Sequence, residues 1–241
     1  MNQDLGGFQV VVAGAGSAGC AAAIAAARSG ARTLLIDRLP FAGGTSTGVL
    51  DTFYGFYTPG AQAKKIVGGL PDVIVTELRK LGKVVERANT YGAGTGITYN
   101  PEHLKVAWER LLVRSGVTLL LHSLIHDVDV KEGHITSLTL SNRAGTFQVR
   151  GDVFIDCTGD ASLTHLSGFS YERAGELSAA QTLTTTFRMV NVDVATRKLV
   201  SKDQLHALMR EASEDGFMLP RKEGSDHITT VRSEEHTSEL Q

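Results

Sequence analysis

A glycine-rich turn near the start of the chain has the spacing of a diphosphate-binding loop. It reads VVAGAGSAGC, with glycines at Gly14, Gly16 and Gly19. Gly14 permits a tight turn, Gly16 leaves room for a pyrophosphate, and Gly19 lets a following helix approach the preceding strand. Backbone N–H groups near Ser17 and Ala18, at the positive end of the helix dipole, can stabilise the phosphate charges. The turn therefore predicts a dinucleotide site.

The elements around this turn have the order that such a site requires. Residues 8–14 predict a buried parallel strand, residues 17–29 a helix, and residues 32–36 a second strand that ends at Asp37. Asp37 follows Gly19 by 18 residues, where its carboxylate can accept both ribose hydroxyls and repel a 2′-phosphate. These residues predict an adenine dinucleotide without a 2′-phosphate. They do not separate NAD from FAD.

A second glycine pair favours FAD. The segment FAGGTST, residues 41–47, follows Asp37 closely and contains Gly43, Gly44, Thr45 and Ser46. Paired glycines expose the backbone, and hydroxyls can donate to the second phosphate or line the approach of an isoalloxazine ring. A nicotinamide-binding domain needs no such loop here. On composition alone, a flexible surface loop remains the alternative.

The rest of the chain alternates between helical and strand patterns. Residues 41–63 and 87–99 are expected to be irregular, with a helix over 71–82 between them. A second amphipathic helix starts at the Asn100 cap and ends at Gly116, and a buried strand covers 117–121. Period-2 segments over 125–130, 134–140 and 145–150 predict an antiparallel meander. Further segments are a buried strand at 153–160, a strand at 182–190, and a helix from Ser201 to about Gly216.

Taken together, these stretches resemble the FAD-dependent oxidoreductases of the glutathione-reductase-like fold, particularly the subgroup related to fumarate reductase flavoproteins. The resembling segments are VVVAGAGSAG with Asp37, AGGTSTG, the PEHLK helix that leads to VTLLLHSLIHDVDVKEGHI, and VFIDCTGDASLTHLSG. The implied α/β fold is a Rossmann-like FAD-binding domain over residues 5–175, a parallel sheet with an antiparallel β-meander crossover. An inserted helical and loop segment would occupy about 50–99, and an α+β substrate domain would begin at 176–231.

The resemblance also implies roles for single residues. Asp37 would bind the adenosine ribose, Arg38 would lie near the adenine, and the main chain near Ile125 would meet the adenine edge. The diphosphate and flavin path would be lined by Gly43, Gly44, Thr45 and Ser46. The chain leaving the last strand would approach FAD through Thr158, Gly159 and Asp160. The expected reaction is hydride transfer between flavin and a small organic substrate.

No catalytic residue follows from the sequence. Tyr54 and Tyr57 could face the ring or the substrate, but aromatic packing is the favoured alternative. Arg188 shares a predicted strand face with Thr184 and Thr186 and could hold a carboxylate, although a solvated face is as good an explanation. His165 is expected to be structural. Cys20 and Cys157 lack a CxxC partner and are expected to be small apolar fillers.

Composition excludes several other classes of protein. The chain has 241 residues, 42% hydrophobic and 21% charged, with a formal net charge of −2. No basic surplus suggests a nucleic-acid partner, and no apolar run reaches a membrane span. With two cysteines, neither a disulfide framework nor a zinc site is expected, and a cytoplasmic location fits. An NAD-linked dehydrogenase, and an FAD-binding protein with a non-redox or RNA-modification role, remain alternatives. The oligomeric state is not predicted.

The last ten residues, RSEEHTSELQ, have no periodicity and resemble the translation of a sequencing adapter. We expect residues 232–241 to be a non-native tail and the natural chain to continue beyond Val231. A charged natural C-terminal tail is the alternative.

Overall fold

The computed structural model describes residues 3–49, 53–58, 62, 64–88, 95–180 and 191–217. The chain divides into two compact units, Met1–Thr186 and Phe187–Gln241. The predicted strand at 182–190 and the expected tail at 232–241 lie outside the described residues.

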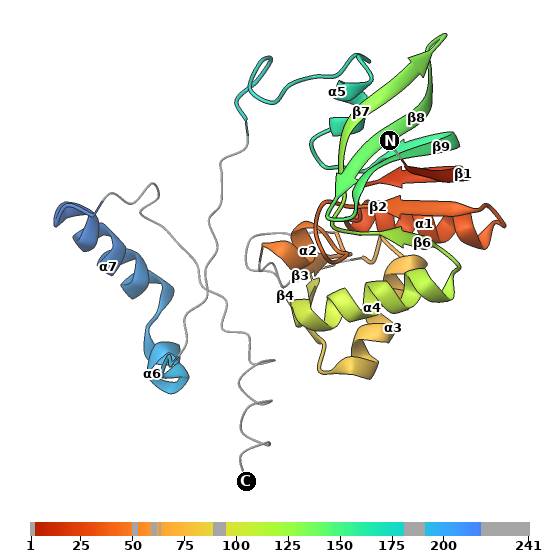
Figure 1. Ribbon diagram of the computed structural model, residues 1–241. Coiled ribbons are helices and arrows are strands. Elements are labelled where there is room, and N and C mark those ends of the chain that lie inside the picture. The colour runs from red at the N-terminus through yellow and green to blue at the C-terminus, as the bar shows by residue number, and fades with distance from the viewer. Residues whose placement is uncertain are drawn as a thin grey trace. The chain divides into compact units, whose positions relative to one another are not determined.

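Parallel strands form the centre of the first unit. The strand β1 (Gln3–Ala13), the helix α1 (Ser17–Arg28) and the strand β2 (Thr33–Ile36) make a β-α-β unit with parallel strands. The strand β6 (Thr118–Leu120) lies parallel beside β2, and β9 (Gly145–Asp156) lies parallel beside β1. The six strands have the order β6-β2-β1-β9-β8-β7 (Figure 1). The predicted α/β class and the first β-α-β unit are confirmed.

The antiparallel part of the sheet corrects one prediction. The strands β7 (Leu124–Lys131), β8 (His134–Asn142) and the first half of β9 form the expected meander. The predicted strands at 145–150 and 153–160, however, form one continuous strand that ends at Asp156, and residues 157–160 are a loop. Gly151 lies at the junction of the two predicted strands, and a Cβ there would lie 2.8 Å from Val11 Cγ2. Gly151 thus lets β9 run close along β1.

The first strand is also longer than predicted. It starts at Gln3, whereas the apolar run starts only at residue 8. Gln3 pairs with Phe147 and Gly7 with Arg150, so the polar first half of β1 is held by the first half of β9. Pairing with a partner strand, which composition alone does not reveal, sets this boundary.

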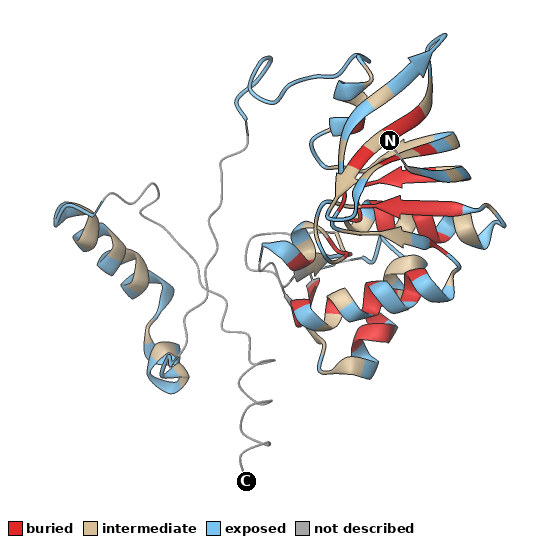
Figure 2. Ribbon diagram, in the orientation of Figure 1, coloured by how far each residue is buried: buried red, intermediate tan, exposed pale blue. Residues whose placement is uncertain are grey.

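Both faces of β2 and of the last residues of β1 are buried, which explains their unbroken apolar sequence. Successive side chains point to opposite faces. Val12 and Leu35 join a core with the helices α1, α3 (Leu70–Leu81) and α4 (Pro101–Arg114). Val11 and Leu34 join a second core with side chains of the meander. Figure 2 shows the buried strands between these two layers.

The segment between β2 and α4 contains a small sheet that the sequence did not predict. The strands β3 (Phe53–Gly55), β4 (Val85–Ala88) and β5 (Thr95–Thr98) are antiparallel, in the order β3-β5-β4. Both regions expected to be irregular contribute strands to it. Each strand has only three or four residues, so no period-2 pattern can be recognised.

The predicted helices of this unit are confirmed. The helix α3 starts one residue before the expected position, and the side chain of Asn100 caps α4 by accepting from Glu102 N at 3.0 Å. Two short helices complete the unit, α2 (Thr45–Gly48) and α5 (Ser162–Leu166).

The described part of the second unit consists of α6 (Val194–Leu199) and α7 (Lys202–Glu214). The helix α7, predicted from Ser201 onward, starts with a capping box: Ser201 Oγ accepts from Gln204 N, and Gln204 Oε1 accepts from Ser201 N. Neither helix contains a buried residue (Figure 2). Within the described ranges, no helix combines the length and apolarity needed to cross a bilayer.

A buried carboxylate joins α3 to α4. The side chain of Glu77 is 7% exposed, and its Oε1 lies 2.8 Å from Lys80 Nζ and 2.8 Å from an Arg114 guanidinium nitrogen. The hydrogen bonds from Lys80 and Arg114 outweigh the effect of burial and lower the pKa of Glu77. Because Arg114 belongs to α4 and Glu77 to α3, this charge ties the two helices together.

Glu77→Gln should lower the free energy of unfolding at neutral pH by about 1–3 kcal/mol, because two charge-assisted hydrogen bonds are weakened. The pKa of Glu77 in the folded protein lies below the unfolded value of about 4.3. The stabilisation by its carboxylate is therefore fully present above that pH. It disappears as the pH falls through the lowered folded pKa. Urea unfolding of both proteins at neutral and acidic pH tests this. Glu86→Gln, which removes an exposed partner of Arg79, is the control and should change little. A difference that persists undiminished in acid would contradict the prediction.

Candidate functional site

The three glycines of the first turn differ in their surroundings. Gly14 has a φ of 95°, and a Cβ there would lie 2.3 Å from the carbonyl oxygen of Cys157. A Cβ on Gly19 would lie 1.8 Å from the carbonyl oxygen of Gly14. A Cβ on Gly16 would instead project into open space, with no heavy atom within 4 Å. Gly14 and Gly19 are thus required by backbone contacts, whereas Gly16 leaves a space before the N-terminus of α1.

The second glycine loop lies directly against the first. Gly43 N donates to Ala15 O at 2.7 Å, and Gly16 and Gly43 form an isolated parallel bridge. A Cβ on Gly44 would lie 2.8 Å from Gly16 Cα. Thr45 and Ser46 follow as the first residues of α2. Two motifs singled out separately in the sequence are therefore in backbone contact.

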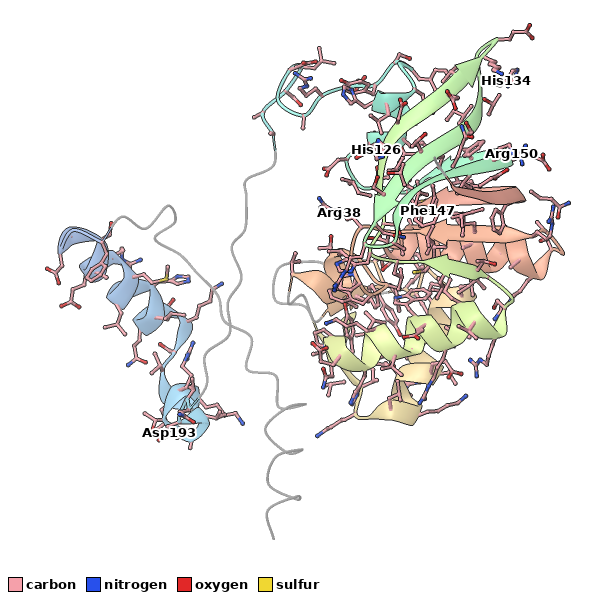
Figure 3. The ribbon with its side chains drawn as sticks, in the orientation of Figure 1. Arg38, His126, His134, Phe147, Arg150 and Asp193 are labelled. Carbon is pink, nitrogen blue, oxygen red and sulfur yellow. The ribbon has the colours of Figure 1, made fainter. Side chains whose placement is uncertain are left out.

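The acidic residue at the end of β2 faces the same turn. One carboxylate oxygen of Asp37 accepts from Ala15 N, and the other accepts from Leu39 N at 2.7 Å. Each oxygen keeps a further lone pair. Arg38 follows and is exposed, as Figure 3 shows. Ser123 N donates to Asp37 O at 2.9 Å, which brings the chain that leads to Ile125 in β7 to the end of β2.

The loop after β9 is ordered by a residue that the sequence analysis did not single out. The side chain of Asp156 accepts four hydrogen bonds, from the backbone N–H and hydroxyl groups of Thr158 and Thr164, at 2.7–3.0 Å. Burial alone would raise the pKa of Asp156, but these hydrogen bonds outweigh it and hold the pKa below its usual value. Thr158 Cα lies close to Gly14, so the loop carrying Gly159 and Asp160 begins beside the first turn.

Three hydroxyl groups, from α1, α2 and β3, lie close together in the same region. Ser17 Oγ lies 2.8 Å from Tyr54 Oη and 3.3 Å from Ser46 Oγ. The ring of Tyr54 packs against Tyr99, with centroids 4.9 Å apart. Burial raises the pKa of Tyr54, and hydrogen bonding to neighbouring side chains only partly offsets this. Tyr54 is therefore a packed neutral phenol. The sequence could not reveal the contact with Ser17, because it depends on the unpredicted strand β3.

Neither cysteine has the properties of a redox thiol. Cys20 is buried and its Sγ donates to Ala15 O at 3.2 Å. Burial raises the pKa of Cys20 to about 12, and burial also raises that of Cys157. Both therefore stay protonated at neutral pH, as their expected packing role requires. Across the described residues, no group of three or more His, Cys, Asp or Glu side chains could hold a metal ion.

The other candidates lie away from these loops or outside the described residues. Tyr57 lines a cavity of about 260 Å³ beside α3, where the charged groups form the pairs Lys65–Asp72 and Arg79–Glu86. The exposed His165 shares a 2.9 Å hydrogen bond with Tyr171 Oη, an arrangement consistent with a structural role. The predicted face formed by Thr184, Thr186 and Arg188 lies outside the described residues.

Asp156→Asn should loosen the loop after β9, because one amide oxygen cannot accept all four hydrogen bonds. We expect a loss of about 1–3 kcal/mol in unfolding free energy and faster amide hydrogen exchange at Thr158 and Thr164. Asp152→Asn, an exposed change on the same strand, is the matched control. Unchanged exchange at both threonines would show that Asp156 does not order the loop.

Comparison with solved structures finds similar chains at low sequence identity. THI4 from Thermovibrio ammonificans is 15% identical with a TM-score of 0.46, covering 68% of this chain and 64% of its own. The p-nitrophenol 4-monooxygenase PnpA from Pseudomonas putida is 15% identical with a TM-score of 0.49, covering 71% and 45%. A flavocytochrome c3 fumarate reductase is 19% identical with a TM-score of 0.44, covering 64% and 34%. This chain thus spans less than two thirds of the length of each.

The family comparison is more extensive. Curated protein sequences gave no match. The family model described as FAD dependent oxidoreductase matches residues 9–240, which is nearly the whole chain. The match includes most of the segment expected to be a non-native tail, and that expectation stays a prediction. The chain therefore belongs to the FAD-dependent oxidoreductase family, whose cofactor is FAD.

Proposed function

We propose that the chain binds FAD where its glycine loops meet, and that the protein transfers a hydride between flavin and a small organic substrate. The observation that carries this proposal is the open space at Gly16, which is bounded by the N-terminus of α1 and by the second glycine loop. A site of this kind fits a diphosphate, because backbone N–H groups and a helix dipole face it without a side chain in between.

The diphosphate is assigned to the first turn of α1. Backbone N–H groups near Gly16, Ser17 and Ala18 would donate to it, since α1 has no side-chain cap that competes for them. Because Gly43 and Gly44 lack side chains, the second loop can border the same open space at Gly16. Thr45 and Ser46 would then add hydroxyl donors toward the flavin side.

The adenosine half is assigned to the ends of β2 and β7. Asp37 retains lone pairs beyond its two backbone hydrogen bonds, and these would accept the ribose hydroxyls. Arg38 would lie near the adenine, and the main chain near Ile125 would meet its edge. Thr158, Gly159 and Asp160 would approach the cofactor from the end of β9.

FAD would supply the hydride chemistry. The residues of this chain would bind and orient the cofactor and exclude water from the site. Asp156 is not suited to donate a proton near neutral pH, because its pKa is lowered. The family assignment favours this proposal over an NAD-linked dehydrogenase. A net charge of −2 gives no support to a role on RNA. We also propose a cytoplasmic location, because Cys20 and Cys157 are free thiols and form no disulfide.

Reconstitution with FAD tests the central claim. After removal of free FAD, the protein should keep the visible absorption bands of oxidised flavin, and an electron donor should bleach them. Bound FAD should also raise the melting temperature, because it binds the folded state alone. A protein that retains no flavin and gains no stability would refute the assignment.

Gly16→Ala and Gly19→Ala should separate ligand binding from folding. Gly16 has a φ of −66° and open space for a Cβ, so Gly16→Ala should change the unfolding free energy by less than about 1 kcal/mol. Its methyl group would occupy the diphosphate space, and we expect at least about a tenfold loss of FAD affinity, equal to about 1.4 kcal/mol.

Gly19→Ala should instead destabilise the fold by about 3 kcal/mol, because its Cβ would collide with the backbone of Gly14. Calorimetry and FAD titration of both variants measure the two effects. Equal losses of stability would contradict the different roles of the two glycines.

A further inference from the structure

The β6–β7 connection, residues 121–123, is tied to the end of β2 by two backbone hydrogen bonds. His122 N donates to Leu39 O at 3.0 Å, and Ser123 N donates to Asp37 O at 2.9 Å. His122 is exposed and has a φ of 57°, in the left-handed region that a residue with a side chain rarely adopts. Such a conformation persists only where the surrounding structure fixes it. The β6–β7 connection is therefore held at Asp37, the residue to which we assign the ribose.

A buried hydroxyl group fixes the same connection. Ser123 is 1% exposed, and its Oγ donates to Leu121 O at 3.1 Å and accepts from Asn142 Nδ2 at 3.2 Å. Asn142 is the last residue of β8, and its Oδ1 accepts from Ala144 N at 2.8 Å. Because the amide oxygen is bound there, the amide nitrogen faces Ser123 and can only donate to it. The side chain of Ser123 thus joins the β6–β7 connection to the turn between β8 and β9.

The residues held in this way also orient the carboxylate of Asp37. Leu39 N donates to one carboxylate oxygen of Asp37 at 2.7 Å, while Leu39 O accepts from His122 N. The carbonyl oxygen of Asp37 accepts from Ser123 N. A shift of the β6–β7 connection would therefore move the main chain of Asp37 and also the donor that fixes its side chain.

We propose that Ser123 and Asn142 are positioning residues for the adenosine half of FAD, because they hold the β6–β7 connection against which Asp37 is oriented. This inference rests on the proposed function and adds two residues that act through Asp37. The carboxylate of Asp37 would accept the ribose hydroxyls with the lone pairs that remain beside its bonds from Ala15 and Leu39. Such a side chain meets its ligand well only when surrounding hydrogen bonds fix its position. The turn between β8 and β9 thereby becomes part of the support of the adenosine site.

Amide hydrogen exchange of the ligand-free protein tests whether these hydrogen bonds hold the β6–β7 connection. Asn142→Ala and Ser123→Ala should each speed exchange at the N–H groups of His122 and Ser123 by about three- to tenfold, as expected for one lost hydrogen bond. Ser141→Ala removes a hydroxyl from the preceding residue of β8, where it lies 3.0 Å from His126 Nε2. This variant is the control and should leave both exchange rates unchanged. Exchange that is unchanged in Asn142→Ala and in Ser123→Ala would overturn the proposal.

Ligand titration well below the melting temperature tests whether Asn142 acts through the ribose contact of Asp37. Asn142→Ala should weaken the binding of FAD and of ADP by about three- to tenfold. The compound 2′-deoxy-ADP lacks one of the hydroxyls that Asp37 would accept, so the same variant should weaken its binding by a smaller factor. A residue that only supports the fold would change the affinities for ADP and 2′-deoxy-ADP equally. Equal factors for these two ligands would overturn the positioning role.

The two measurements distinguish failure of the inference from failure of the proposed function. If the unaltered protein binds neither FAD nor ADP, the proposed function is wrong and the positioning role is wrong with it. If the unaltered protein binds FAD but the losses for ADP and 2′-deoxy-ADP are equal, the proposed function stands and only the positioning role is wrong. Faster exchange together with a larger loss for ADP than for 2′-deoxy-ADP supports both.

Discussion

The site depends on one close backbone contact, where the turn after β1 lies between α1 and the end of β9. Side chains at Gly14 or Gly19 would overlap the carbonyl oxygens of Cys157 and Gly14, so the contact exists only because Cβ atoms are missing. It sets the distance between α1 and the sheet. It also sets where the first-turn N–H groups point, and it leaves the open space at Gly16. The other loops are arranged around this contact: the 41–47 loop bonds to Ala15, and Asp37 accepts from the same residue.

Many of the helices and strands could be predicted, because the sequence patterns that indicate them are local. Glycine spacing, the buried runs of β1 and β2, and the side-chain caps at Asn100 and Ser201 each involve residues a few positions apart. What the sequence did not reveal depends on distant pairing. In the small sheet β3-β5-β4, β3 pairs with β5 more than 40 residues further along the chain, and all three strands are too short to show a period. The predicted strands at 145–150 and 153–160 left a gap within β9, because the close contact of Gly151 with Val11 cannot be recognised from the neighbouring residues.

The same distinction holds within the candidate site. Gly14, Gly16, Gly43, Gly44 and Asp37 were singled out from their motifs, and the structure brings them together. Asp156 and the Ser17–Tyr54 contact were not, since each is defined by partners and not by residue type. An aspartate before Cys157 reads as one more polar residue at a strand end. Only the three-dimensional arrangement shows that four donors converge on its carboxylate.

Four ionisable groups near the loops keep a constant charge state near neutral pH. Hydrogen bonds hold Asp156 ionised, while burial holds Tyr54, Cys20 and Cys157 protonated at neutral pH. Groups fixed in this way can position a ligand but cannot exchange protons with it near neutrality, because a general acid or base needs a pKa close to the working pH. The described loops are therefore suited to holding a cofactor in place.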